Sequence, residues 1–249
     1  MVFMHSGMSS RVRSKLLRGS GGLPLGGLRA AAIAGLVAIL ALGHFVFSGI
    51  TLPALVGSVA IYTGAVVLTG WLMQRHYPHD RLGFCNVVTF SRMVLAASLV
   101  MPLVAGVSDT WPVLALALCA LALDGVDGWL ARREGLVSAF GARFDMEVDA
   151  AFALVLSVLA YASGSAGVLV LALGLPRYVF TAAAMVLPWL NGPLPERASR
   201  KVVCVVQLAT LIVLQVPGAV ATAPLVAVVV AALIWSFGRD IVWLWRQRT

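Results

Sequence analysis

The chain has 249 residues, of which 61% are hydrophobic and only 11% are charged, and its mean hydropathy is +0.97. This composition excludes an ordinary soluble protein and indicates a polytopic membrane protein with little room for a separate soluble domain. The net charge of +8 favours cytoplasmic anchoring and contact with anionic lipid over nucleic-acid binding, because basic residues interleaved with aromatic ones are absent from the sequence.

Residues 1–28 are basic and then rich in Gly and Ser. The apolar run that follows is too long for a signal peptide, so we expect a retained cytoplasmic tail. Eight apolar segments come next, each near the roughly 20 residues that span a bilayer. An all-α membrane fold is therefore expected, with segments at about 29–50, 54–74, 86–107, 111–131, 144–163, 166–189, 202–217 and 223–245.

The connections between these segments differ sharply in charge. With eight spans both termini lie on one side of the membrane, and all the basic connections fall on that side. The opposite connections contain neither Lys nor Arg, near residues 51–53, 108–110, 164–165 and 218–222. Because Lys and Arg are enriched in cytoplasmic loops, we predict that both termini are cytoplasmic.

The first two segments carry few ionisable groups, and we interpret residues 29–85 as an accessory helix pair with its connector. A six-helix core is expected at 86–249. The third segment begins with Asn86, Thr89 and Arg92, which recur every three residues and so lie on roughly one helix face. Arg92 is about two turns inside and should face protein or a polar cavity. The alternative is a capping role with a snorkelling arginine.

Four carboxylates lie at the ends of the fourth and fifth segments: Asp124, Asp127, Asp145 and Asp149. Spacings of three or four residues put each pair on one helix face, so two helices joined by a short loop would present the pairs to one another. Convergent carboxylates are hard ligands that suit Mg²⁺, Mn²⁺ or Ca²⁺. The alternative is structural pairing with Arg132, Arg133 and Arg143.

The sixth and seventh segments add candidate anion-binding residues. Pro176 should kink the sixth segment, and Arg177 beside it indicates an anion pocket or the neutralisation of an aspartate. Arg200 and Lys201 precede the seventh segment. Lys201 is a candidate for binding a phosphate of a substrate, and an ordinary positive-inside flank is the competing interpretation.

The stretch from Asp124 to Asp149 resembles the signature of the CDP-alcohol phosphatidyltransferases, D-x2-D-G-x2-A-R-x8-G-x3-D-x3-D. Its fixed positions are Asp124, Asp127, Gly128, Ala131, Arg132, Gly141, Asp145 and Asp149. The resemblance implies a six-helix core and two divalent ions, Mg²⁺ or Mn²⁺, held by the four aspartates, with Asp149 also the catalytic base. It further implies that the donor nucleotide contacts Asn86, Thr89, Arg92, Gly128, Ala131, Arg132 and Gly141.

The resemblance implies transfer of a phosphatidyl group from CDP-diacylglycerol to a polar alcohol with release of CMP, in the inner membrane of a bacterium and as a homodimer. Glycerol 3-phosphate is the first choice of acceptor, as in a phosphatidylglycerophosphate synthase-like member, because Arg177, Arg200 and Lys201 could form a pocket for an anion. The rival function is a transporter or a non-catalytic scaffold. Its weakness is that the charges cluster at one membrane surface and form no path across the membrane.

Overall fold

The computed structural model describes residues 25–79, 81–106, 110–134, 138–195, 197–218 and 222–248. The expected tail at 1–28 lies outside these ranges up to residue 24. The described residues form helices joined by short turns and contain no strand, which confirms the all-α prediction.

The first helices are α2 (Leu25–Phe45), α3 (Leu52–His76), α4 (Gly83–Ser98), α5 (Val100–Ala105), α6 (Thr110–Glu134) and α7 (Ala139–Ala162). The remaining elements are η1 (Val168–Val170), α8 (Leu171–Gly174), α9 (Pro176–Val186), η2 (Pro188–Asn191), α10 (Ala198–Val213) and α11 (Thr222–Gln247). Each of the eight expected segments corresponds to one helix or to a run of consecutive helices.

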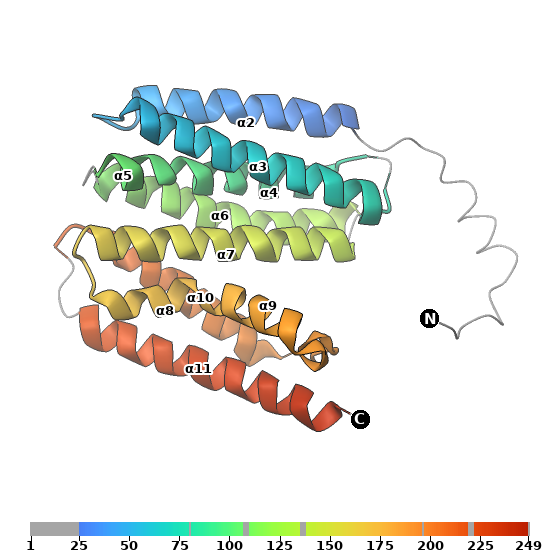
Figure 1. The fold of residues 1–249 in the computed structure, drawn as a ribbon. Helices are drawn as coiled ribbons and strands as arrows, with labels where there is room; N and C mark the ends of the chain where they lie inside the picture. The colour runs from blue at the N-terminus through green and yellow to red at the C-terminus, as the bar shows by residue number, and fades with distance from the viewer. Residues whose placement is uncertain are drawn as a thin grey trace, which may run out of the picture.

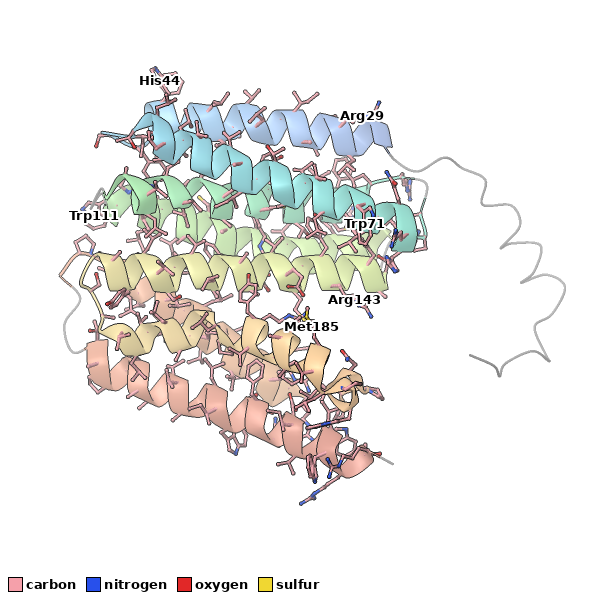
Figure 2. The ribbon with its side chains drawn as sticks, in the orientation of Figure 1. Arg29, His44, Trp71, Trp111, Arg143 and Met185 are labelled. Atoms are coloured by element: carbon pink, nitrogen blue, oxygen red, sulfur yellow. The ribbon has the colours of Figure 1, made fainter. Side chains whose placement is uncertain are left out.

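The helices lie side by side in layers (Figure 1). The pair α2 and α3 forms one side of the bundle, and α11 forms the other, with α7 between them. Behind α7, α4 packs against both α6 and α7. The start of α2 and the end of α11 lie at the same end of the bundle (Figure 1). Arg29 and Arg143 lie at this end, whereas His44 and Trp111 lie at the opposite end (Figure 2).

Four described helices are long and apolar enough to cross a membrane: Gly26–Phe45, Leu52–His76, Gly83–Ala105 and Thr222–Gln247. A fifth candidate is the broken pair Val168–Gly174 and Pro176–Val186, which bends by 61°. The other three expected spans are also helical, but α10 has only 16 residues and α7 carries four charged residues in its first half. In α6 the apolar part is shorter, Trp111–Val126.

The break in the sixth segment follows from Pro176, which lacks a backbone N–H and cannot continue the hydrogen bonding of the preceding turn. The prediction of a kink at this residue is confirmed by the 61° bend. The side-chain amide of Gln207 on α10 donates to the carbonyl oxygen of Leu173, 2.5 Å away, so a backbone acceptor near the break is satisfied from a neighbouring helix.

The helices α2 and α3 are attached to the rest of the bundle by packing and by specific hydrogen bonds. Ser58 on α3 is fully buried and donates to the carbonyl oxygen of Ala97 on α4, 2.7 Å away. The hydroxyl of Tyr62 on α3 donates to the carbonyl oxygen of Ala32 on α2 at 3.1 Å. A Cβ atom on Gly35 would overlap the Tyr62 side chain and lie 2.7 Å from Val94 Cγ2. A glycine is therefore needed where α2 crosses α3 and α4.

Candidate metal centre

Arg92 of α4 lies at the centre of the site. It is only 2% exposed, as expected from its position two turns inside the helix. Its guanidinium faces α6 and α7, where it forms ion pairs with three carboxylates. Nη2 lies 2.9 Å from Asp124 Oδ1 and also contacts Asp149 Oδ1, while Nη1 lies 2.5 Å from Asp145 Oδ1. A planar guanidinium with five donors is suited to bridging several carboxylates in this way.

The three carboxylates converge as the spacing predicted. Asp124 projects from the second half of α6, and Asp145 and Asp149 project from adjacent turns of α7. One ligand atom from each lies within 4.8 Å of the others. Their side chains are 34%, 37% and 32% exposed, whereas Arg92 is enclosed. The oxygen cluster is therefore backed by a buried cation and reachable from outside the bundle.

Several predicted site residues lie outside the described side chains. Asp127, Gly128, Ala131 and Arg132 belong to α6, but only their backbone is described, so their roles stay predictions. The described ion pairs nevertheless identify Arg92 as a partner of the aspartates. The alternative of structural pairing had named only Arg132, Arg133 and Arg143, which are close to Asp124 or Asp145 in sequence.

The chemistry of the cluster fits a divalent cation. Three carboxylates so close together repel one another unless positive charge lies between them, and here the Arg92 guanidinium supplies it. Oxygen ligands from Asp are those that Mg²⁺ and Mn²⁺ prefer, and the exposed sides of the carboxylates leave room for water or phosphate oxygens. Asp124, Asp145 and Asp149 would hold the metal, and Arg92 would have to give up its position among them.

The beginning of α4 is held by the chain itself. The side-chain amide of Asn86 donates to the carbonyl oxygen of Leu82 at 2.7 Å and to the hydroxyl of Tyr77 at 2.9 Å. Thr89 donates to the carbonyl oxygen of Cys85 at 3.2 Å. Both Asn86 and Thr89 are buried, so the described role of these two side chains is to fix the helix that carries Arg92. Contact with a nucleotide stays a prediction.

The start of α7 is fixed in a similar way. Ser138 caps the helix, and its hydroxyl oxygen accepts from the backbone N–H of Gly141 at 3.0 Å. A Cβ atom on Gly141 would lie 3.2 Å from that hydroxyl and 3.7 Å from Asn86 Oδ1. Gly141 is thus small where α7 meets the beginning of α4. Two residues of the predicted donor-binding set, Asn86 and Gly141, are brought together one to two turns from Asp145.

Arg177 pairs with Glu147 of α7. Arg177 Nε lies 3.2 Å from Glu147 Oε1, and Nη2 of Arg177 contacts the same oxygen. A third of the Arg177 side chain is exposed, so it is less enclosed than its mid-segment position indicated. Its carboxylate partner is Glu147, and not one of the clustered aspartates that the sequence analysis considered. Binding of an acceptor anion by Arg177 stays a prediction.

The other two predicted acceptor residues lie on α10. Arg200 Nε donates to Asp240 Oδ2 of α11 at 2.9 Å, and Nη2 of Arg200 donates to the carbonyl oxygen of Pro195 at 3.2 Å. Lys201 is exposed. Arg177 and Arg200 therefore bind separate carboxylates, and a shared pocket for one anion stays a prediction.

The sequence did not indicate three interactions of this region, namely those made by Glu147, Asp240 and Gln207. A signal existed for Asp240, because it is the single acidic residue in the last apolar segment and is 5% exposed. Glu147 stands between two metal-ligand candidates and points to another helix. Its spacing of two residues from each places it on a different helix face, but only the three-dimensional arrangement shows that Arg177 covers that face.

Comparison with known proteins agrees with this geometry. The family model for CDP-alcohol phosphatidyltransferase matches residues 82–237, which is more than half of the chain and includes α4, α6, α7 and α10. No curated protein and no solved structure matches the chain. The matched region carries all three described carboxylates and their arginine, and the chain therefore belongs to the CDP-alcohol phosphatidyltransferases, phosphotransferases of phospholipid synthesis that are embedded in the membrane.

Proposed function

We propose that this member of the family transfers the phosphatidyl group of CDP-diacylglycerol to a polar alcohol and releases CMP. The observation that carries the proposal is the convergence of Asp124, Asp145 and Asp149 around one position between α6 and α7. A diphosphate donor needs positive charge where its phosphorus–oxygen bond breaks, and a carboxylate cluster that holds Mg²⁺ or Mn²⁺ supplies it. Two ions are expected from the family resemblance.

In the proposed reaction the acceptor hydroxyl oxygen attacks the phosphorus that carries the diacylglycerol. A new phosphorus–oxygen bond forms to the acceptor, the bond to the bridging oxygen of the diphosphate breaks, and CMP leaves with that oxygen. Asp149 accepts the hydroxyl proton. Its place on α7 supports this role, because its carboxylate is one third exposed and reachable by an acceptor. Asp124, Asp145 and Asp149 would hold the divalent ions, whose positive charge would offset the negative charge that develops on the leaving oxygen.

Glycerol 3-phosphate is our first choice of acceptor. The support is the number of cations on the helices that follow the site, namely Arg177 at the start of α9 and Arg200 and Lys201 at the start of α10. A phosphate oxygen of the acceptor would compete with Glu147 for Arg177 and with Asp240 for Arg200. Because each arginine already has a carboxylate partner, the acceptor phosphate has to displace it, and the net gain in binding is smaller than at an arginine with no partner.

We also propose a bacterial inner-membrane location in which both termini and the site face the cytoplasm. The support is the absence of Lys and Arg from the connections at the opposite end. Residues 86–249 would form the catalytic domain, with 29–85 an accessory pair; the family match beginning at residue 82 supports this division. A homodimer is expected from the family resemblance alone.

The test is a CMP-release assay on the purified full chain with CDP-diacylglycerol, Mg²⁺ and a panel of alcohols that includes glycerol 3-phosphate, inositol phosphate, phosphatidylglycerol and serine. Asp149→Asn serves as the inactive control. CMP release that depends on one acceptor supports the proposal and identifies the alcohol. Absence of CMP with every acceptor would favour the transporter or scaffold, and release with another alcohol only would reject glycerol 3-phosphate.

A further inference from the structure

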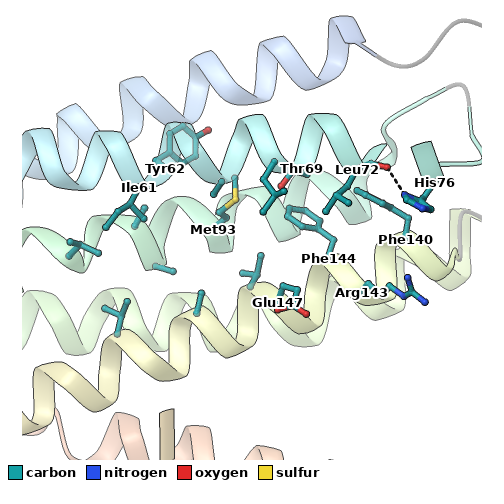
Figure 3. A pocket seen from close by; sticks show the side chains of 18 of the residues that line it. Ile61, Tyr62, Thr69, Leu72, His76, Met93, Phe140, Arg143, Phe144 and Glu147 are labelled. Atoms are coloured by element: carbon teal, nitrogen blue, oxygen red, sulfur yellow. Dashed lines mark hydrogen bonds between the residues drawn. The ribbon is translucent and has the colours of Figure 1, made fainter. Parts of the chain in front are cut away.

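A long apolar groove runs between α3, α4 and α7 (Figure 3), and neither Asp145 nor Asp149 of α7 lines it. Its volume is about 470 Å³. Tyr62, Thr69 and Leu72 of α3 form one wall, and Phe140, Phe144 and Val148 of α7 form the other. Small residues of α4, Ala96 and Ala97, contribute to the floor. Most of the lining side chains are apolar, so the space suits an apolar molecule.

The groove opens towards the apolar exterior of the bundle. Ile61 and Leu68 on its edge are 54% and 56% exposed, so its side is continuous with the surface that hydrocarbon would cover. Along α3 it extends from Ile61 to His76, which corresponds to roughly 22 Å at 1.5 Å per residue. One leaflet of hydrocarbon is about 15 Å thick, so the groove is longer than one leaflet and has room for the full length of an acyl chain.

One end of the groove is polar and cationic. Arg143 and His76 line it, at the end of the bundle where Arg29 also lies (Figures 2 and 3). Within the described part of the chain Arg143 forms no ion pair, whereas Glu147, which also lines the groove, is paired with Arg177. Next to this end, the guanidinium of Arg75 lies 3.9 Å from the centre of the Trp71 ring. An anionic group is therefore favoured at the end of the groove.

We propose that this groove binds one acyl chain of an anionic phospholipid, whose phosphate lies against Arg143. At roughly 30 Å³ for each water-sized group, the cavity holds about 15 methylene-sized groups, which is the scale of a single acyl chain. A helix about 10 Å across and as long as the groove would occupy roughly 1,700 Å³, well above the volume of the cavity, so a helix of a second copy does not fit inside it. The lipid is a bound companion of the protein and not the reacting donor, because the groove lies on a different face of α7 from Asp145 and Asp149.

The proposal gives the helix pair α2 and α3 a function outside the family-matched region. Without α3 the groove would lose one wall, and the aromatic side chains of Phe140 and Phe144 would face hydrocarbon directly. Ser58 of α3 holds this wall against α4, because it donates a hydrogen bond to Ala97, a residue of the groove floor. The bound lipid would thus join the accessory pair to α7, the helix that carries two of the three described carboxylates.

The test measures lipid retained by the purified full chain with native mass spectrometry, after exchange into micelles containing equal amounts of phosphatidylglycerol and phosphatidylcholine. Ala65→Phe fills the groove, and Ala227→Phe, at an exposed position of α11, is its matched control. Arg143→Gln removes the cation, and Arg246→Gln, exposed in the last turn of α11, is the control for charge. Each sample is also measured in excess EDTA.

We expect one retained phosphatidylglycerol per chain, a loss of at least tenfold in Ala65→Phe, and loss of the preference for phosphatidylglycerol in Arg143→Gln. Both control variants should retain the lipid as the wild type does, and EDTA should have no effect. Equal retention by Ala65→Phe and Ala227→Phe would overturn the proposal, as would equal retention of the two lipids by the wild type. Loss of lipid in EDTA would place it at the metal centre and also reject the groove. None of these readouts requires CMP release, so they are independent of the proposed reaction.

Discussion

Replacing Arg92 by Gln tests the electrostatic balance of the metal centre. The change removes a buried cation that forms ion pairs with Asp124, Asp145 and Asp149. Breaking a buried ion pair costs about 3–5 kcal/mol, and losing a charged hydrogen bond costs about 1.5–3 kcal/mol. The carboxylates are about one third exposed, so solvent screens them and the lower range applies. We expect a loss of about 2–3 kcal/mol in the unfolding free energy of the metal-free protein.

The same substitution should strengthen metal binding, because a divalent ion no longer has to displace the guanidinium. A gain of about 2 kcal/mol corresponds to roughly 30-fold in the dissociation constant for Mn²⁺. The midpoint temperature of unfolding in EDTA should fall by about 5–10 °C. The affinity for Mn²⁺, measured by electron paramagnetic resonance without substrate, should increase. Arg177→Gln, which breaks an ion pair outside the cluster, is the control and should leave Mn²⁺ binding unchanged. Unchanged or weaker Mn²⁺ binding in Arg92→Gln would refute the reasoning.

Three further tests use single substitutions, two of them with a comparison variant. Asp149→Asn should lower the CMP-release rate by about 10²–10⁴-fold while the protein remains folded, and near-normal turnover would exclude this residue as the base. If Arg177 binds an anionic acceptor, Arg177→Gln should lower kcat/KM for the acceptor by roughly 10–150-fold and leave kcat/KM for the donor unchanged. Glu147→Gln should not weaken acceptor binding. Similar losses for both substrates in both variants would indicate a structural ion pair. Gly174→Ala should lower the thermal stability, since the new Cβ would lie 2.8 Å from Leu154 Cα. A Cβ at Gly238 would have no neighbouring atom within 4 Å, so Gly238→Ala should be neutral or slightly stabilising. Equal effects of the two substitutions would contradict the close packing of α8 on α7.

Much of the fold was predictable because the signals are local. Apolar runs of bilayer length gave the positions of the helices, and Pro176 gave the position of the bend. The break at Leu99 between α4 and α5 was not predicted, although Pro102 stands one turn beyond it. The expected end of the sixth segment at 189 was also too late, because α9 ends at Val186 and Pro188 begins a separate 3-10 turn.

The site was predictable only in part. Spacing along α7 put Asp145 and Asp149 on one face, and the predicted meeting of the two carboxylate-bearing helices is confirmed for Asp124. The partner of these residues was harder to find. Arg92 is 53 residues from Asp145 and 57 from Asp149 in the chain. Periodicity identifies the face on which a residue lies, but it does not say which helix covers that face. The pairing of Arg177 with Glu147 was missed for the same reason.

The capped start of α7 sets how far the reaction lies from the end of the bundle. Asp145 and Asp149 come seven and eleven residues after Ser138, or about 10 and 16 Å along the helix axis. Asp124 lies ten residues before the end of α6, about 15 Å from it. In the proposed reaction a hydrophilic acceptor would approach the site between the helices, and water that follows it would compete for the same phosphorus. The ratio of alcohol transfer to donor hydrolysis becomes a direct measure of how tightly these helices close around the acceptor.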